Sequence, residues 1–339
     1  MRRILILLVP LLLAMSFSAT AAEAKPVLGI ADQKPETFQD QRLKDLKLKY
    51  ARLYIPWDVL KDRHSLEVTD RWMAGAKADR LEPLLTIARS RVPSKIRIRP
   101  SEKALVAEFK KWRKRWPGQV SKISTWNEAN ESETAARVGG WWLALRKACP
   151  TCTVLGADLL DSPNVLQWAS DFAAFTQKKA KKKPTIWGLH AYNDANTYRT
   201  TITKAILKGV KGDIWITETG GVSTRPRPIY TFTACGVKHQ TKATSFLLNN
   251  IAKLSPRIKR IYIFNWGLGS NDASFDSALV DAENRERPSL NVIRKFLGQP
   301  EVTMPEGGFS PGSKTCKFKG TRKASVPKAV KKAKTTKKK

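Results

Sequence analysis

Two glutamates lie at the ends of short apolar runs of the chain. Glu128 follows Asn127 and closes the run "VSKISTWNE" at 120–128, and Glu218 lies in "DIWITETG" at 213–220. A carboxyl group in such a place adds little to stability, because burying it is costly. Two carboxyl groups brought together can instead do chemistry, in which one donates a proton and the other attacks as a nucleophile.

The elements that must position these glutamates follow an alternating pattern. Strand-like apolar runs lie at 26–32, 50–57, 81–88, 120–128, 152–160, 185–192, 213–220 and 258–267. Helical patterns follow them at 36–46, 69–80, 101–116, 133–148, 164–180, 198–210, 238–254 and 287–298. The runs are apolar almost throughout, as parallel strands buried on both faces are. Eight such units predict an α/β fold, a single-domain (β/α)8 TIM barrel at residues 25–299.

An open doubly wound sheet is the competing interpretation of this alternation. Such a sheet usually has fewer strands, and a glycine-rich phosphate-binding loop follows its first strand. Here "ADQKPETF" follows the first run, without a G-x-G-x-x-G pattern. The barrel is therefore favoured.

In a (β/α)8 barrel the active site lies at the carboxyl ends of the strands. The fourth predicted strand ends at Glu128 and the seventh at Glu218, so the two carboxyl groups should face each other across the barrel mouth. Glycoside hydrolysis needs this arrangement, in which one carboxyl group protonates the leaving oxygen and the other attacks or stabilises the anomeric carbon. Other candidate site residues fall at the same end: Arg52, Asn127, His190, Tyr192 and Trp266.

With Asn-Glu on the fourth strand and Glu on the seventh, the whole barrel resembles glycoside hydrolase clan A. The resemblance implies a retaining O-glycosyl hydrolase that cleaves a polysaccharide or oligosaccharide by double displacement, with Glu128 as the acid/base and Glu218 as the nucleophile. It also implies roles for the other residues. Asn127 would contact the sugar 2-hydroxyl, and Tyr192 or His190 would be the hydrogen-bond partner of the nucleophile. Trp266 would form the aromatic floor under the sugar, and Arg52 would be the arginine beside the nucleophile.

The family within the clan is open. Many members have Asn-Glu-Pro on the fourth strand, whereas this chain has Ala129 in place of the proline. The nearest in appearance are family 39 and the wall-glucanase families. His190 could equally be a packing residue, and Trp266 could belong to the core. The alternative function is a catalytically weak or inactive barrel that binds glycans or anionic polymers at a cell wall.

The two ends of the chain have compositions of their own. Residues 1–24 have a basic start, a short apolar run and a small-x-small site, which predicts a cleaved signal peptide rather than a membrane anchor, and hence secretion. Residues 300–339 form a Lys-rich extension, expected to be disordered from about residue 317. Residues 313–339 hold twelve Lys and Arg and no acid, so they supply 12 of the formal charge of +33. This tail could hold the secreted protein at an anionic wall or surface polymer.

The four cysteines suit an oxidising compartment. Cys149 and Cys152 lie in the turn at the bottom of the predicted barrel, whereas Cys235 lies at the top. The predicted disulfides are therefore Cys149–Cys152 and Cys235–Cys316.

The sequence predicts neither a cofactor nor a metal site. No zinc-type cysteine spacing is present, and the three histidines are far apart in the sequence. The expected partner is a glycan substrate. The protein is expected to be a monomer without a membrane span. The tail has no interleaved aromatic residues, so a specific nucleic-acid partner is not expected.

Overall fold

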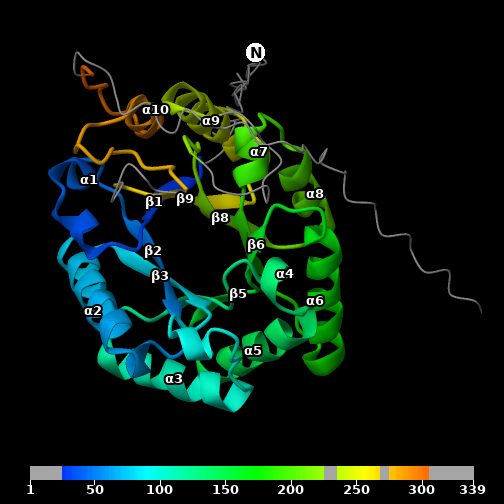
Figure 1. Cartoon of the computed structure of the whole chain (residues 1–339). Coiled ribbons are helices and arrows are strands. Elements are labelled where there is room, and N and C mark those ends of the chain that lie inside the picture. Colours follow the sequence, from blue (N-terminus) through cyan, green and yellow to red (C-terminus); the bar gives the residue numbers. More distant parts are fainter. Residues whose placement is uncertain (1–24, 225–234, 268–274, 305–339) are drawn as a thin grey trace, which may run out of the picture.

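The computed structural model describes residues 25–224, 235–267 and 275–304, which form a nearly closed barrel of nine parallel strands inside a ring of helices (Figure 1). The strands are β1 (Val27–Ala31), β2 (Tyr50–Pro56), β3 (Glu82–Ala88), β4 (Lys122–Ser124), β5 (Thr153–Leu155), β6 (Asp158–Leu160), β7 (Ile186–His190), β8 (Asp213–Thr219) and β9 (Ile258–Phe264). Their order in the sheet is β5-β4-β3-β2-β1-β9-β8-β7-β6. The predicted TIM-barrel fold is confirmed.

The ninth strand arises because the predicted strand at 152–160 is interrupted. Its first half, β5, pairs with β4, and its second half, β6, pairs with β7. Between them, the Gly156 N–H donates to the carbonyl of Ile186 at 3.0 Å, and the Asp158 N–H donates to the carbonyl of Trp126 at 3.0 Å. The two halves are thus one barrel strand that changes its hydrogen-bonding neighbour midway, and the barrel closes across this change.

The described helices lie outside the strands. They are α1 (Gln41–Asp45), α2 (Arg63–Ala78), α3 (Glu102–Arg115), α4 (Ala129–Ser132), α5 (Ala135–Ala148), α6 (Val165–Ala180), α7 (Tyr192–Asn196), α8 (Thr201–Gly209), α9 (Val237–Asn249) and α10 (Pro288–Leu297). The helix predicted at 36–46 is shorter than expected, because a 3-10 turn occupies Pro35–Gln39 and Asp40 then caps α1. None of the helices in the described ranges is both long and apolar enough to cross a membrane.

Helix α3 illustrates why these segments are helical. The Ser101 hydroxyl caps its first turn by accepting from the N–H of Ala104 at 3.2 Å. Its buried residues Leu105, Phe109 and Trp112 recur at a helical spacing and form the face that packs on the barrel. Its last turn is basic, which suits the negative end of the helix dipole.

The predicted Cys149–Cys152 disulfide is present in the turn between α5 and β5, with the two Cα atoms 5.3 Å apart. Cys149 ends α5, where its N–H donates to the carbonyl of Leu145. The second predicted pair, Cys235–Cys316, stays a prediction, because Cys316 lies outside the described residues.

The short Cys149–Cys152 loop should make a modest contribution to stability. Replacing both cysteines by alanine is expected to lower the free energy of unfolding by about 2 kcal/mol, because a small loop constrains the unfolded chain only slightly. Urea unfolding followed by tryptophan fluorescence measures the change. Thr151→Ser, in the same exposed turn, is the control because it keeps the hydroxyl that contacts the Cys149 sulfur, and it should stay within about 0.5 kcal/mol of the original protein. Equal stability of the double variant and the control would contradict the expectation.

Candidate active site

Arg52 lies at the centre of the candidate site. Its side chain projects from β2 into the barrel and is fully buried. The guanidinium donates to Glu218 Oε2 at 2.6 Å, Asn127 Oδ1 at 2.7 Å, Asp158 Oδ2 at 2.7 Å and Thr86 Oγ1 at 3.0 Å. These partners belong to β8, to the loop after β4, to β6 and to β3. One side chain on β2 therefore connects four other segments of the barrel.

The charges in this network compensate one another. Burial alone would lower the pKa of Arg52, but the negative charges of Asp158 and Glu218 raise it, so the guanidinium stays charged. Burial alone would raise the pKa of Asp158, but the Arg52 charge and a hydrogen bond from His190 hold it well below its usual range. Asp158 also accepts from the hydroxyls of Ser124 at 2.6 Å and Thr86 at 2.8 Å. Buried ions are tolerated when they are paired and hydrogen-bonded in this way.

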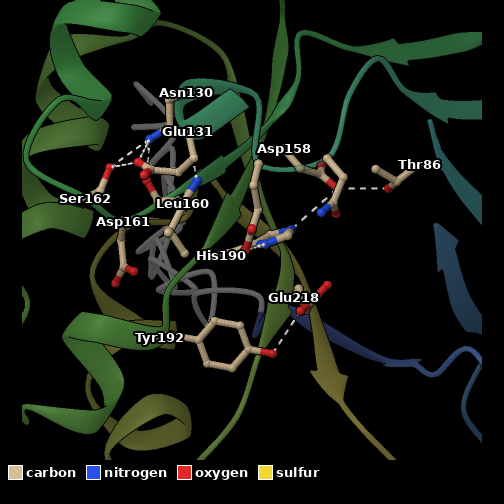
Figure 2. A network of polar contacts seen from close by, with 12 residues as sticks. Thr86, Asn130, Glu131, Asp158, Leu160, Asp161, Ser162, His190, Tyr192 and Glu218 are labelled. Carbon is tan, nitrogen blue, oxygen red and sulfur yellow. Dashed lines mark hydrogen bonds and ion pairs between the residues drawn. The ribbon is translucent and has the colours of Figure 1, made fainter. Parts of the chain in front are cut away.

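Glu218 is held through both of its oxygens. Arg52 donates to Oε2 at 2.6 Å, and the hydroxyl of Tyr192 donates to Oε1 at 3.0 Å. Figure 2 shows this hydroxyl directed at the carboxyl group. The side chain is 12% exposed, so it is fixed in orientation and still reachable from the barrel mouth.

Glu128 lies on the other side of the barrel mouth, just before α4. Its backbone is left-handed, with φ 45° and ψ 51°, a conformation that is costly for a residue other than glycine. Asn130 holds the following turn, because its side chain bonds both the N–H and the carbonyl of Leu160, at 2.8 and 3.0 Å (Figure 2). The Glu128 side chain is 33% exposed and lines a cavity. Strain of this kind is typical of functional positions.

His190 connects the two sides of the site. Its Nδ1 lies 3.2 Å from Glu128 Oε1, and its Nε2 lies 3.5 Å from Asp158 Oδ2. Burial alone would lower the pKa of this imidazole. The charge of Glu218 and the hydrogen bonds with Asp158 and Glu128 outweigh burial and raise the pKa to about 9. His190 is therefore a positively charged link between Glu128 and the Arg52 network at neutral pH.

Asp158 is the charged residue of this network that the sequence pattern does not predict. It lies in an apolar run whose pattern predicts only an ordinary buried strand. The available signal was its charge, since a carboxylate in such a strand needs a buried partner. Gly188 on β7 leaves room for it, because a Cβ there would collide with Asp158 Oδ1 and lie 2.9 Å from Thr217 Oγ1.

Trp266 lies apart from these contacts. Its ring is 2% exposed, and its indole N–H donates to Asp40 Oδ2 at 2.8 Å, while its backbone N–H donates to Asp32. This placement resembles a core residue more than an open platform for a sugar. Two other aromatic rings, those of half-buried Phe264 and Phe275, pack in one cluster with Tyr192.

A cavity of about 730 Å³ opens beside Glu128. This volume lies within the range of small-molecule and oligosaccharide-sized sites. Asn127 and Glu128 contribute the fourth-strand side of its lining, and Tyr54 and Leu160 contribute parts of neighbouring strands. Six of the seven residues predicted for the site thus meet at one end of the barrel, and the cavity opens on the side of that end where Asn127 and Glu128 lie.

Known proteins resemble this chain in structure but not in sequence. No protein-family model matches the chain. No curated protein matches it either. Among solved structures, a psychrophilic endo-β-1,4-xylanase of glycoside hydrolase family 10 superposes with a TM-score of 0.57 at 11% identity, covering 80% of this chain and 96% of that chain.

Two further solved structures are similar. Fungal β-1,4-galactanases match with a TM-score of 0.57 at 13% identity, over 80% of this chain and 100% of theirs. A glucosidase from Croceicoccus marinus matches with a TM-score of 0.59 at 11% identity, over 81% of this chain and 67% of that chain. At these identities the likeness shows the fold, a barrel that this chain has in common with several glycoside hydrolases.

Proposed function

We propose that the protein is an O-glycosyl hydrolase acting on a polysaccharide or oligosaccharide. The observation that carries the proposal is that Glu128, just before α4, and Glu218, on β8, are joined through His190, Asp158 and Arg52 into one network of hydrogen bonds and ion pairs. Hydrolysis of a glycosidic bond needs two carboxyl groups held on opposite sides of that bond. The xylanase, galactanase and glucosidase that resemble this chain in fold support the same reaction class.

The first step follows from the contacts of each group. Glu218 attacks the anomeric carbon as a carboxylate, oriented by Tyr192 and Arg52. Glu128 gives its proton to the leaving oxygen, and the N–H at Nδ1 of His190 stabilises the carboxylate that forms. Asn127, whose amide oxygen accepts from Arg52, keeps its amide N–H groups for the sugar hydroxyl beside the reacting carbon.

The second step returns the enzyme to its starting state. Glu128, now ionised, takes a proton from water, and the water displaces Glu218 from the anomeric carbon. The configuration at that carbon is retained, which requires the two carboxyl groups to act about 5–5.5 Å apart. A barrel that only binds glycans has no need to hold both carboxyl groups in this network, so the binding-only alternative is not favoured.

Glutamine substitutions test the two carboxyl groups. Glu128→Gln should lower kcat/KM on a cleaved oligosaccharide by about 10²–10⁴-fold, because general acid–base catalysis is lost. Glu218→Gln should lower it further, since no glycosyl-enzyme can form. Azide should partly restore turnover of Glu218→Gly, and proton NMR should show the first product with its anomeric configuration unchanged.

The matched control is Glu131→Gln. Glu131 lines the same cavity, but its carboxyl group accepts from Ser162 and Asn130 and has no bond to the Arg52 network. This variant should keep kcat/KM within a few-fold of the original. The assignment would be wrong if both Gln variants of the proposed pair turned over like the control, or if the original protein cleaved nothing in a broad oligosaccharide panel.

The titration of His190 tests the electrostatic link. His190 should lose its proton near pH 9, because its raised pKa keeps it charged below that pH. Glu218→Gln removes the negative charge that contributes most to this increase, so the pKa of His190 should fall. Side-chain NMR of His190 in the original protein and in the variant measures both values. An unchanged His190 titration in the variant would refute the coupling.

We also propose that the protein is secreted and that its Lys-rich tail retains it at anionic polymers. The support is the sequence alone, with its apolar start and a tail of twelve cations. Ending the chain at Gly320 removes nine of the twelve cations and keeps Cys316, so it should strongly weaken retention on a phosphate-bearing polymer at moderate salt. Turnover of a soluble neutral oligosaccharide should be unchanged. Equal retention of both forms would disprove the role of the tail.

A further inference from the structure

The loop that follows β3 is strongly basic and borders the candidate site. Residues 89–100 contain four arginines and one lysine and no acidic residue. The loop leaves the carboxyl end of β3, which is the end where Asn127 follows β4. Arg89, Arg91 and Arg99 line the same cavity as Glu128. A ligand that reaches Glu128 through this cavity therefore meets the loop.

The three arginines of the lining differ in how their charges are used. Arg99 forms an ion pair with Glu133, and its guanidinium lies over the ring of Trp126. Its charge is compensated within the protein. Among the residues that the structure describes, no carboxylate pairs with Arg89 or Arg91, and both side chains are exposed. These two charges are available to a ligand.

The loop is anchored between the two free arginines and again at its far end. At its start, the hydroxyl of buried Ser90 donates to Asp58 Oδ2 at 2.9 Å, and the N–H of Val92 donates to the same hydroxyl at 3.2 Å. At its end, the indole N–H of Trp141 donates to the carbonyl of Pro100 at 3.0 Å. The segment with Arg89 and Arg91 is thus fixed to the barrel, and a fixed charge binds with less loss of entropy.

Arg91 is oriented further by an aromatic contact. Its guanidinium lies over the ring of Tyr54, 5.1 Å from the centroid, and Tyr54 itself lines the cavity. Stacking holds the plane of the guanidinium while leaving its N–H groups free to donate. The cavity also contains Glu131, but Ser162 and Asn130 already donate to that carboxyl group.

We propose that the substrate is an acidic glycan, whose carboxylate or sulfate groups are bound by Arg89 and Arg91 beside the bond that Glu128 protonates. The inference rests on the proposed hydrolase function and adds the substrate class. Guanidinium groups bind planar oxyanions through paired, charge-assisted N–H donors. A neutral glycan can accept hydrogen bonds from these arginines through its hydroxyls, but only an acidic glycan also offsets their positive charges.

The test compares acidic oligosaccharides with neutral forms of the same backbone. The probes are galacturonan, glucuronoxylan and hyaluronan oligosaccharides, each beside its carboxyl-reduced product, with chondroitin sulfate oligosaccharides to separate sulfate from carboxylate. The readout is the ratio of kcat/KM for the acidic form to that for its neutral counterpart. The full-length chain is used throughout, so the basic tail contributes equally to every variant.

The double variant Arg89→Ala with Arg91→Ala should lower this ratio by about 10- to 100-fold, the range expected for losing hydrogen bonds to a charged group. Arg97→Ala is the matched control, since Arg97 is exposed in the same loop but does not line the cavity. It should leave the ratio unchanged. Added salt should lower the ratio of the original protein, because exposed charges are screened.

The outcomes separate this inference from the proposed function. Cleavage of the neutral forms with a ratio that the double variant does not alter would overturn the inference and leave the hydrolase intact. If no oligosaccharide is cleaved, the binding of each acidic oligosaccharide and of its neutral counterpart is measured by calorimetry instead. Acid-selective binding that the double variant loses supports the inference although the hydrolase fails. Equal binding of acidic and neutral forms overturns it.

Discussion

The structure depends on one buried charge, the guanidinium of Arg52. It is fully buried, so each N–H without a partner and any uncompensated charge would be costly. Its partners Thr86, Asp158 and Glu218 come from β3, β6 and β8, and Asn127 follows β4. Losing one partner of a buried ion pair costs about 3–5 kcal/mol. The barrel can hold Arg52 only if these strands end at their observed register, and that register is what brings Glu128 and Glu218 to one mouth.

Two carboxylates pair with Arg52, and they have different roles: one stabilises the buried charge and the other can react. Asp158 is fully buried, receives two hydroxyl donors and has no exposed face, so it is a permanent partner. Glu218 is partly exposed and is the partner that would become an ester during the proposed reaction. When that happens, Glu218 loses its charge but Asp158 still compensates Arg52. The nucleophile can therefore change its charge during the reaction without leaving the buried arginine unpaired.

The sequence predicted those site residues that lie at the ends of the barrel strands. The apolar runs located the barrel strands, and their ends located Glu128, Glu218 and Asn127 together. It could not predict the break in the strand at 152–160, because apolar composition does not say which neighbour a strand pairs with. Asp158 was missed for a related reason, since its partner Arg52 is 106 residues away. Trp266 was placed correctly near a strand end, but its orientation depends on Asp40, in a segment far away in sequence.

The formal charge of +33 comes from basic residues that have different roles in this molecule. Arg52 is buried among carboxylates and orders the site, and Arg99 is neutralised by Glu133 and fixes a loop. Arg89 and Arg91 lie on that same loop with solvent-exposed guanidinium groups. These four arginines thus differ in burial and in partners, and of the four, Arg89 and Arg91 are the ones whose guanidinium groups can bind a substrate in the cavity. A basic composition alone suggests adhesion to any polyanion. A fixed pair of free arginines beside Glu128 would do more, because by binding the acidic groups of a glycan it would determine which glycosidic bond lies at Glu128.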